Sequence, residues 1–306
     1  MNLSKFSAVL SFRKLWLGCC GLGALTLPDT SRAAEASDAG TLAYHLATNA
    51  AGYAAGRNGG YGDQLEIKAP NSHGLDRLTN AVWSPAFWLK GVHGLSATPI
   101  GFSSVLGAQG LPTMVSPRHY LCATHMHPEG YQIAFLDTNN VVHWRHTLQR
   151  VDVGNDVSTG ILDADLPPAV GFLPVLPGNY TNRLPAFTYV QGIGMNQDLC
   201  LFGQPMIFGV VNFVNWNSHA TVLPGLTKNW NVTIRGGDSS NPEMLLIGNQ
   251  LVLVSHNYTV GGGPNYAAQL AAINQSMHRL STNQQAGTDY QLTQFPLDRW
   301  PLVHGK

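Results

Sequence analysis

The stretch that decides the fold of this chain is Gly236-Gly237-Asp238-Ser239-Ser240-Asn241-Pro242, which lies between two apolar strand patterns. A strand is expected before it, over 230–234, and a hairpin after it, over 244–255. The residue types in this stretch are also those of ordinary polar turns. In a tight turn between strands, however, a serine presents its hydroxyl to solvent with main-chain N–H groups behind it. Ser239 is therefore a candidate nucleophile, and the N–H groups of Gly237 and Ser239 are a candidate oxyanion hole.

A histidine follows a short apolar strand nearer the middle of the chain. The pattern Tyr-Leu-Cys-Ala over 120–123 predicts a strand that ends just before Thr124-His125. A general base must be held by a rigid element, within about 3 Å of the group that it deprotonates. His125 is therefore the candidate base, and His119 and His127 are the neighbouring alternatives. A single histidine in such a position is more often structural, so the assignment depends on what lies elsewhere in the chain.

An aspartate precedes the next apolar strand. The sequence Asn155-Asp156-Val157 leads into the apolar pair Ile161-Leu162. A buried carboxylate in such a place can orient an imidazole and stabilise its protonated form. Asp156 is the candidate, although the simpler role of a strand-capping residue would account for it alone. The alternative carboxylates nearby are Asp152, Asp163 and Asp165.

Taken together, these segments resemble the trypsin-like serine peptidases of the chymotrypsin fold. Thr124-His125 resembles the family's Ala-Ala-His segment, and 155–162 resembles its Asp-Ile-Ala-Leu-Leu segment. Residues 237–242 are similar to Gly-Asp-Ser-Gly-Gly-Pro. The chain order His, Asp, Ser is also that of the chymotrypsin group, and differs from the orders in subtilisins and α/β-hydrolases. The resemblance covers about residues 96–280.

The resemblance implies an all-β fold of two antiparallel six-stranded β-barrels, with a C-terminal helix and an N-terminal helical or loop arm. His125 and Asp156 would come from the first barrel and Ser239 from the second. The implied activity is that of an endopeptidase that hydrolyses a polypeptide substrate through an acyl-enzyme and needs no cofactor.

The resemblance also implies substrate-binding residues. Thr233 would form the floor of the specificity pocket, and Ser255-His256-Asn257 would form a substrate-facing edge strand. Because Thr233 is neutral, an unpaired cation buried there would be costly, so an apolar or small residue is expected before the scissile bond.

Three features depart from the family pattern. Ser240 replaces the glycine that usually follows the nucleophile, and Met126 stands where a disulfide cysteine is common. There is no Ile-Val-Gly-Gly activation sequence before the first barrel. Asp238, which in such zymogens pairs with a new N-terminal ammonium, therefore needs another donor, or the chain folds directly into its active form. We expect the second.

The first 36 residues predict an export signal. Lys5, Arg13 and Lys14 precede an apolar run over 15–27, and Ala34-Glu35-Ala36 is a small-x-small cleavage site. This run is short beside the roughly 20 residues that span a bilayer. We therefore expect a secreted or periplasmic protein without stable membrane association after signal removal. The predicted regions are a signal (1–36), an arm (37–95), a first barrel (96–170), a second barrel with its helix (171–282) and a tail (283–306).

Composition agrees with a turn-rich β protein. Charged residues make up 11% of the chain, against about 25% in typical soluble domains. The formal net charge is zero, and no basic run suits nucleic-acid binding. Only Cys122 and Cys200 lie beyond the signal, and the sequence leaves open whether they pair.

Two other functions are compatible with the same residues. His125 and His127 form an H-x-H pair, which can bind zinc in a metal-dependent hydrolase. The same double barrel could also serve as a pseudo-peptidase, that is, a binding module without catalysis. The intact set of three catalytic residue types argues against the second alternative.

The remaining pattern predicts two helices and a series of short strands. Helices are expected over 41–56 and 265–281. The further strands are expected at 113–115, 131–136, 141–153, 187–190, 199–202, 206–214 and 220–223.

Overall fold

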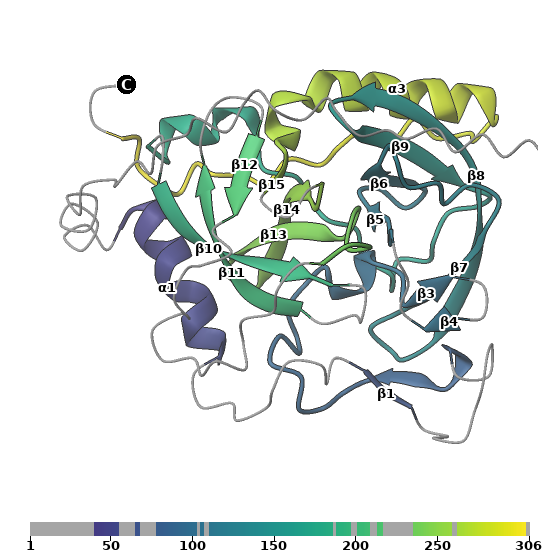
Figure 1. Cartoon of the computed structure of the whole chain (residues 1–306), viewed down its shortest axis with the longest axis horizontal. Helices are drawn as coiled ribbons and strands as arrows, with labels where there is room; N and C mark the ends of the chain where they lie inside the picture. Colours follow the sequence, from purple (N-terminus) through teal and green to yellow (C-terminus); the bar gives the residue numbers. More distant parts are fainter. Residues whose placement is uncertain are drawn as a thin grey trace, which may run out of the picture. The chain divides into compact units, whose positions relative to one another are not determined.

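The computed structural model of the chain is mostly β, with two large antiparallel sheets, a separate two-stranded pair and the α-helices α1 (Leu42–Ala54) and α3 (Leu270–Asn283) in the described residues (Figure 1). The predicted signal and Thr233 lie outside the residues that the structure describes. Those are residues 40–54, 65–67, 78–102, 105–106, 110–185, 188–196, 201–208, 213–216, 235–258 and 262–303.

The first sheet has seven strands in the order β4-β3-β7-β8-β9-β6-β5. The neighbouring strands β9 and β6 are buried along their whole length, whereas β8, in the centre of the sheet, is largely half-exposed. The bounds are β3 (Gly101–Phe102), β4 (Val105–Leu106), β5 (Thr113–Met114), β6 (His119–Ala123), β7 (Gln132–Leu136), β8 (Val142–Gly154) and β9 (Val157–Leu162).

The second sheet has six strands in the order β14-β13-β10-β11-β12-β15. Its edge strands approach each other, because a Cβ on Gly263 of β15 would overlap the main-chain oxygen of His256 at the end of β14. The bounds are β10 (Thr188–Met195), β11 (Leu201–Phe208), β12 (Phe213–Trp216), β13 (Pro242–Ile247), β14 (Gln250–His256) and β15 (Gly262–Pro264).

The two sheets repeat the same pairing pattern. In the first sheet β3 pairs with β7, β7 with β8, β5 with β6 and β6 with β9. When the short strand β4 is left out of the first sheet, the strands at the same places in chain order in the second sheet form the same four pairs: β10 with β13, β13 with β14, β11 with β12 and β12 with β15. Each half of the chain therefore folds its strands in one common order, in which strands distant in sequence become neighbours.

Two α-helices flank the sheets. In α3 (Leu270–Asn283), Ile273, Met277 and Leu280 are buried at helical spacing, and Ser276 Oγ donates to Thr159 Oγ1 of β9 at 2.6 Å. Helix α1 (Leu42–Ala54) packs against β10 and β13. Helix α1 begins and ends within two residues of its predicted bounds, whereas α3 begins five residues after the predicted start, because Tyr266–Ala268 form a separate 3₁₀ turn. Among the described residues, no helix has both the length and the apolar character that a bilayer span requires.

The short strands β1 (Leu65–Ile67) and β2 (Ala81–Trp83) form a separate antiparallel pair. Trp83 Nε1 donates to Asp137 O at 2.9 Å, and Trp83 N donates to Asn140 Oδ1 at 2.7 Å. The segment therefore attaches to the first sheet through the turn between β7 and β8.

One predicted strand break is wrong. The sequence predicted separate strands over 199–202 and 206–214, but β11 runs through Pro205 to Phe208. Proline cannot donate a ladder hydrogen bond, so it is tolerated where a strand lacks a partner. In the described residues the pairing of β11 with β12 begins at Met206, and the ladder partner described for Pro205 is Gln191 of β10.

Candidate active site

His125 and Asp156 form a close hydrogen-bonded pair. His125 follows directly after β6, and its Nδ1 lies 2.8 Å from Asp156 Oδ2. The other carboxylate oxygen, Oδ1, accepts the main-chain N–H of His125 at 3.1 Å. The histidine side chain is 44% exposed and the aspartate side chain 12%. A largely buried carboxylate thus orients a solvent-accessible imidazole, with its Nδ1 side bound and its Nε2 side available.

The hairpin between β8 and β9 places Asp156. Asn155 and Asp156 form its tip with φ values of 54° and 61°, a left-handed conformation that Asn and Asp tolerate better than other side chains. The main-chain oxygen of Asp156 accepts Thr124 N–H at 2.9 Å. The tip of this hairpin is therefore joined to the end of β6 through both main chain and side chain.

The alternative residues near this pair have other partners. His127 Nδ1 lies 2.8 Å from Arg150 Nη2, and His119 is fully buried between Ser116 and Ser281. The alternative carboxylates lie elsewhere: Asp152 Oδ1 accepts from Thr124 Oγ1, Asp163 from the His146 N–H, and Asp165 from the Tyr290 hydroxyl. Among the four candidate carboxylates, Asp156 is the one that hydrogen-bonds to His125 in the described residues.

Ser239 lies in the turn that precedes β13. Asp238 N–H donates to Arg235 O at 3.1 Å, and Arg235 N–H donates to Asp238 Oδ2 at 2.7 Å. The Asp238 carboxylate, fully buried, thus has a donor within its own turn. Gly237 has φ 100°, a conformation that favours glycine. Within the described residues, no acceptor is found for the N–H of Gly237 or of Ser239, so both donors stay available, as an oxyanion hole needs.

Ser240 joins the serine turn to the histidine strand. Its Oγ accepts the N–H of Ala123, the last residue of β6, at 2.7 Å. Its own N–H donates to Asn257 O at 3.1 Å. Ser240 also has φ 74°, which explains why a glycine would be expected here. The side-chain hydrogen bond compensates for this backbone strain. It also places Ser240, the residue after Ser239, against Ala123, which precedes His125 by two residues.

The described hydrogen bonds do not include one between Ser239 Oγ and His125. Such a bond is often long or poorly aligned in a free enzyme and tightens when substrate binds. The described hydrogen bonds therefore join the Ser239 turn to the end of β6 and His125 to Asp156.

His256 is a neighbour that the sequence assigned a different place. Its side chain is 1% exposed, its Nε2 lies 3.9 Å from Asp156 Oδ2, and its Nδ1 is hydrogen-bonded to the Tyr266 hydroxyl. The Nε2 distance is too long for a hydrogen bond, but it leaves the ring facing the carboxylate. No local signal marks His256, because the contact depends on where β14 ends relative to the β8–β9 hairpin.

The pKa values in this cluster favour an ionised aspartate and a neutral buried histidine. Burial raises the pKa of Asp156, whereas the facing His256 ring and the hydrogen bonds from His125 lower it. The lowering effects together are larger, so the pKa of Asp156 lies below its ordinary value. Burial lowers the pKa of His256, an effect that the adjacent Asp156 only partly offsets. Asp156 is therefore available as the anion that stabilises a protonated His125.

The predicted substrate-binding strand occupies a sheet edge, but its side chains are buried. Ser255, His256 and Asn257 are at most 1% exposed, and β14 pairs with β13 alone among its strand ladders. Tyr258, the next residue, is 43% exposed and lies edge-on to the His125 ring at 6.2 Å between centroids. Tyr258 is therefore a surface residue beside His125 that the sequence did not single out.

A second buried carboxyl lies below the serine turn. Glu243 on β13 is fully buried, and neither of its oxygens has a hydrogen-bond partner among the described residues. Burial, and then the nearby Asp238 carboxylate, raise its pKa well above the ordinary value. Both effects favour the neutral form of the Glu243 carboxyl.

Cys122 is a free thiol, fully buried, and burial raises its pKa. Cys200 lies outside the described residues. Where the trypsin-like pattern would have a disulfide, Met126 packs against Gly110 so closely that a Cβ on this glycine would overlap the Met126 side chain. Close packing therefore holds the chain in place at Met126, the residue after His125.

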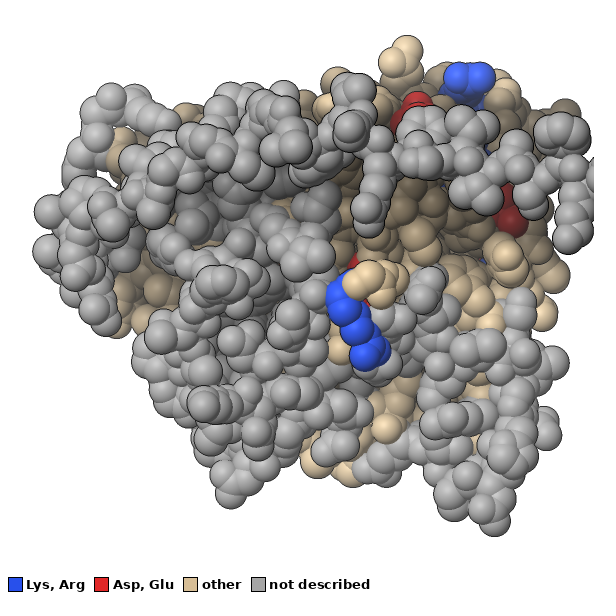
Figure 2. All heavy atoms as spheres, in the orientation of Figure 1, with Lys and Arg blue, Asp and Glu red and all other residues tan. Residues whose placement is uncertain are grey.

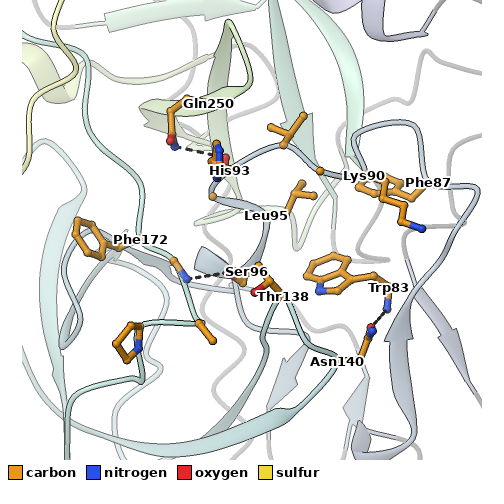
Figure 3. A pocket seen from close by; sticks show the side chains of 16 residues that line it. Trp83, Phe87, Lys90, His93, Leu95, Ser96, Thr138, Asn140, Phe172 and Gln250 are labelled. Atoms are coloured by element: carbon orange, nitrogen blue, oxygen red, sulfur yellow. Dashed lines mark hydrogen bonds between the residues drawn. The ribbon is translucent and has the colours of Figure 1, made fainter.

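Two cavities lie in different parts of the molecule. One of about 290 Å³ adjoins the residues after His125 and is lined by Phe102, Gly110, Met126, His127, Pro128 and Tyr131. The other, of about 720 Å³, lies beside the start of β14, where Figure 3 shows Trp83, Leu95 and Phe172 around it and Gln250 at one side. Because β14 spans seven residues, this larger cavity is roughly 20 Å from His256 at the strand's other end.

Charge and metal ligands are sparse on the described surface. On the face in Figure 2, Lys, Arg, Asp and Glu atoms appear singly rather than as a patch. In the described part of the chain, no three His, Cys, Asp or Glu side chains are grouped as a metal site would require. The sequence alternative of a zinc site at His125 and His127 thus lacks a third ligand there. A scan of protein-family models and a search of curated proteins both gave no match to the chain.

Proposed function

We propose that this chain is an exported serine endopeptidase in which Ser239, His125 and Asp156 form a catalytic triad. The observation that carries the proposal is the doubly hydrogen-bonded His125–Asp156 pair, with the Ser239 turn joined to the same strand end through Ser240. Three segments more than 30 residues apart converge where acyl transfer needs an alcohol, an imidazole and a carboxylate.

The proposed reaction follows from the roles of these groups. His125 Nε2 takes the proton of Ser239 Oγ as the oxygen attacks the scissile carbonyl carbon. The resulting oxyanion accepts hydrogen bonds from the N–H groups of Gly237 and Ser239, each worth about 3 kcal/mol. His125 then gives its proton to the leaving amine, and water repeats the sequence to release the acyl group. Asp156 holds the imidazole tautomer and stabilises its charged form.

The fold supports a double-barrel architecture for this enzyme. The approach of β15 to the end of β14 is what closure of the six-stranded sheet into a barrel would produce, and the seven-stranded sheet shares four strand pairs with it once β4 is left out. In that arrangement His125 and Asp156 belong to the first barrel and Ser239 to the second, so the cleft between them would take a polypeptide. The apolar 290 Å³ cavity next to Met126 offers room for an apolar side chain beside the site.

The proposal is tested by reaction with a fluorophosphonate, which labels activated serines. The wild type is expected to be labelled and to hydrolyse casein, and both activities are expected to vanish in Ser239→Ala. His278→Ala serves as a matched control, because His278 also pairs with an aspartate, Asp289, but lies on α3. Labelling that persists in Ser239→Ala would refute the nucleophile. A folded wild type that is never labelled would instead favour the pseudo-peptidase alternative.

A further inference from the structure

Arg150 lies beneath the loop that carries His125. It projects from β8, its side chain is only 13% exposed, and Arg150 Nη1 donates to Thr124 O at 2.7 Å and to Ser158 Oγ at 2.9 Å. Arg150 Nη2 lies 2.8 Å from His127 Nδ1. One guanidinium therefore binds the residue immediately before His125 and a residue two positions after it.

A carboxylate and a hydroxyl fix the guanidinium in turn. Arg150 Nε donates to Glu129 Oε1, and Ser158 Oγ lies 2.9 Å from Thr124 Oγ1. A planar guanidinium with five donors in a rigid fork can make such contacts simultaneously, whereas a lysine ammonium cannot reproduce their geometry. The contacts of Arg150 reach Thr124, His127 and Glu129, so they restrain the chain on both sides of His125.

The loop is also held by Met126, which packs against Gly110, and by Thr147 Oγ1, which donates to Pro128 O. The loop follows the end of β6, and within it His125 and His127 are exposed, so burial alone does not fix their positions. Asp156 orients the His125 ring through Nδ1 but does not contact the following residues. A catalytic base displaced by about 1 Å can lose about 100-fold in rate, so the restraint on this loop has a kinetic consequence.

We infer that Arg150 is a positioning residue for the general base: it clamps the His125 loop so that Nε2 stays directed at Ser239. The inference rests on the proposed function of His125. It concerns an interaction on β8 that the triad itself does not include.

The test compares Arg150→Met with Arg145→Met. Arg145 lies on the same strand, and its guanidinium also binds main-chain oxygens, those of Trp144 and Asp165, away from the His125 loop. Arg150→Met is expected to lower the second-order rate constant of fluorophosphonate labelling, and kcat on casein peptides, by roughly 10- to 100-fold with little change in KM. Arg145→Met is expected to change either rate by less than about threefold. Melting temperatures of both variants measure any loss of stability.

A spectroscopic readout separates positioning from stability. The proton between His125 Nδ1 and Asp156 gives a far-downfield ¹H NMR signal, which is assigned by its absence in His125→Ala. This signal is expected to broaden or shift in Arg150→Met and to remain unchanged in Arg145→Met. Equal labelling rates and unchanged signals in the two variants would overturn the inference, as would an activity loss that only follows the melting temperature. A wild type that is never labelled would instead remove the proposed function.

Discussion

The two sides of the candidate site are held in different ways. On the histidine side, Asp156 makes two hydrogen bonds to His125 and a third through its main chain to Thr124. On the serine side, the described link to the first sheet is a hydrogen bond from Ala123 N–H to Ser240 Oγ. The base is thus fixed before substrate arrives, whereas the nucleophile depends on a turn joined to the base by one side chain. Changes on the histidine side should therefore act on catalysis, and changes at Ser240 on stability first.

The largest expected effect is that of Asp156→Asn, which retains the shape of the side chain but removes its charge. Without the carboxylate, His125 adopts the wrong tautomer and loses the anion that stabilises its protonated form, so kcat is expected to fall roughly 10⁴-fold. Asp152→Asn is the matched control, because Asp152 accepts from Thr124 and Gly154 and does not face His125. Casein hydrolysis measures both variants, and similar activity in the two would contradict the assignment of Asp156.

A smaller effect is expected on the free energy of unfolding at acid pH. It comes from His119, which is buried, whereas His125 is exposed. Burial first, and then the neighbouring Arg118, lower the pKa of His119 to about 4, while Asp165 and Asp289 act in the opposite direction. Because the unfolded chain binds this proton near pH 6.5, the native state should be progressively destabilised between about pH 6.5 and 4, by about 3 kcal/mol in total.

Urea unfolding of the wild type and His119→Gln at pH 7 and pH 4.5 measures this contribution. The glutamine variant is expected to lose less stability over that interval, since it has no group to protonate. Equal losses in the two proteins would show that His119 titrates alike in the folded and unfolded states.

The smallest effect is expected at the link between the two sides. Ser240→Ala removes the acceptor of the buried Ala123 N–H and keeps the strained φ, so the free energy of unfolding should fall by about 1 to 3 kcal/mol. Ser240→Gly loses the same hydrogen bond but relieves the strain, so it should be less destabilised than the alanine variant. Urea denaturation ranks the two, and the opposite order would show that backbone strain at residue 240 has no energetic weight.

Local sequence was sufficient to select the residues of the candidate site. His125, Asp156 and Ser239 each follow or precede an apolar strand, and short motifs mark such positions without knowledge of the pairing. The Asn155-Asp156 tip shows why Asp156 was preferable to its neighbours, because only there does the chain turn back toward β6.

The supporting residues could not be predicted, because their contacts are set by the pairing of distant strands. The contact of His256 with Asp156 spans 100 residues, and that of Ser240 with Ala123 spans 117. Arg150 looks like an exposed strand residue in the sequence, and only the fold places it beneath the His125 loop. The break expected at Pro205 was wrong for the same reason, since the local proline signal was weaker than the pairing of β11 with β10.

The most direct test of the account is a crystal structure of the wild-type protein that resolves both Ser239 Oγ and His125 Nε2. The account predicts that these two atoms lie about 3 Å apart in at least one Ser239 rotamer, with Asp156 on the opposite side of the imidazole. Ser239 and His125 on separate faces of the molecule, with no rotamer able to bring them into contact, would contradict it.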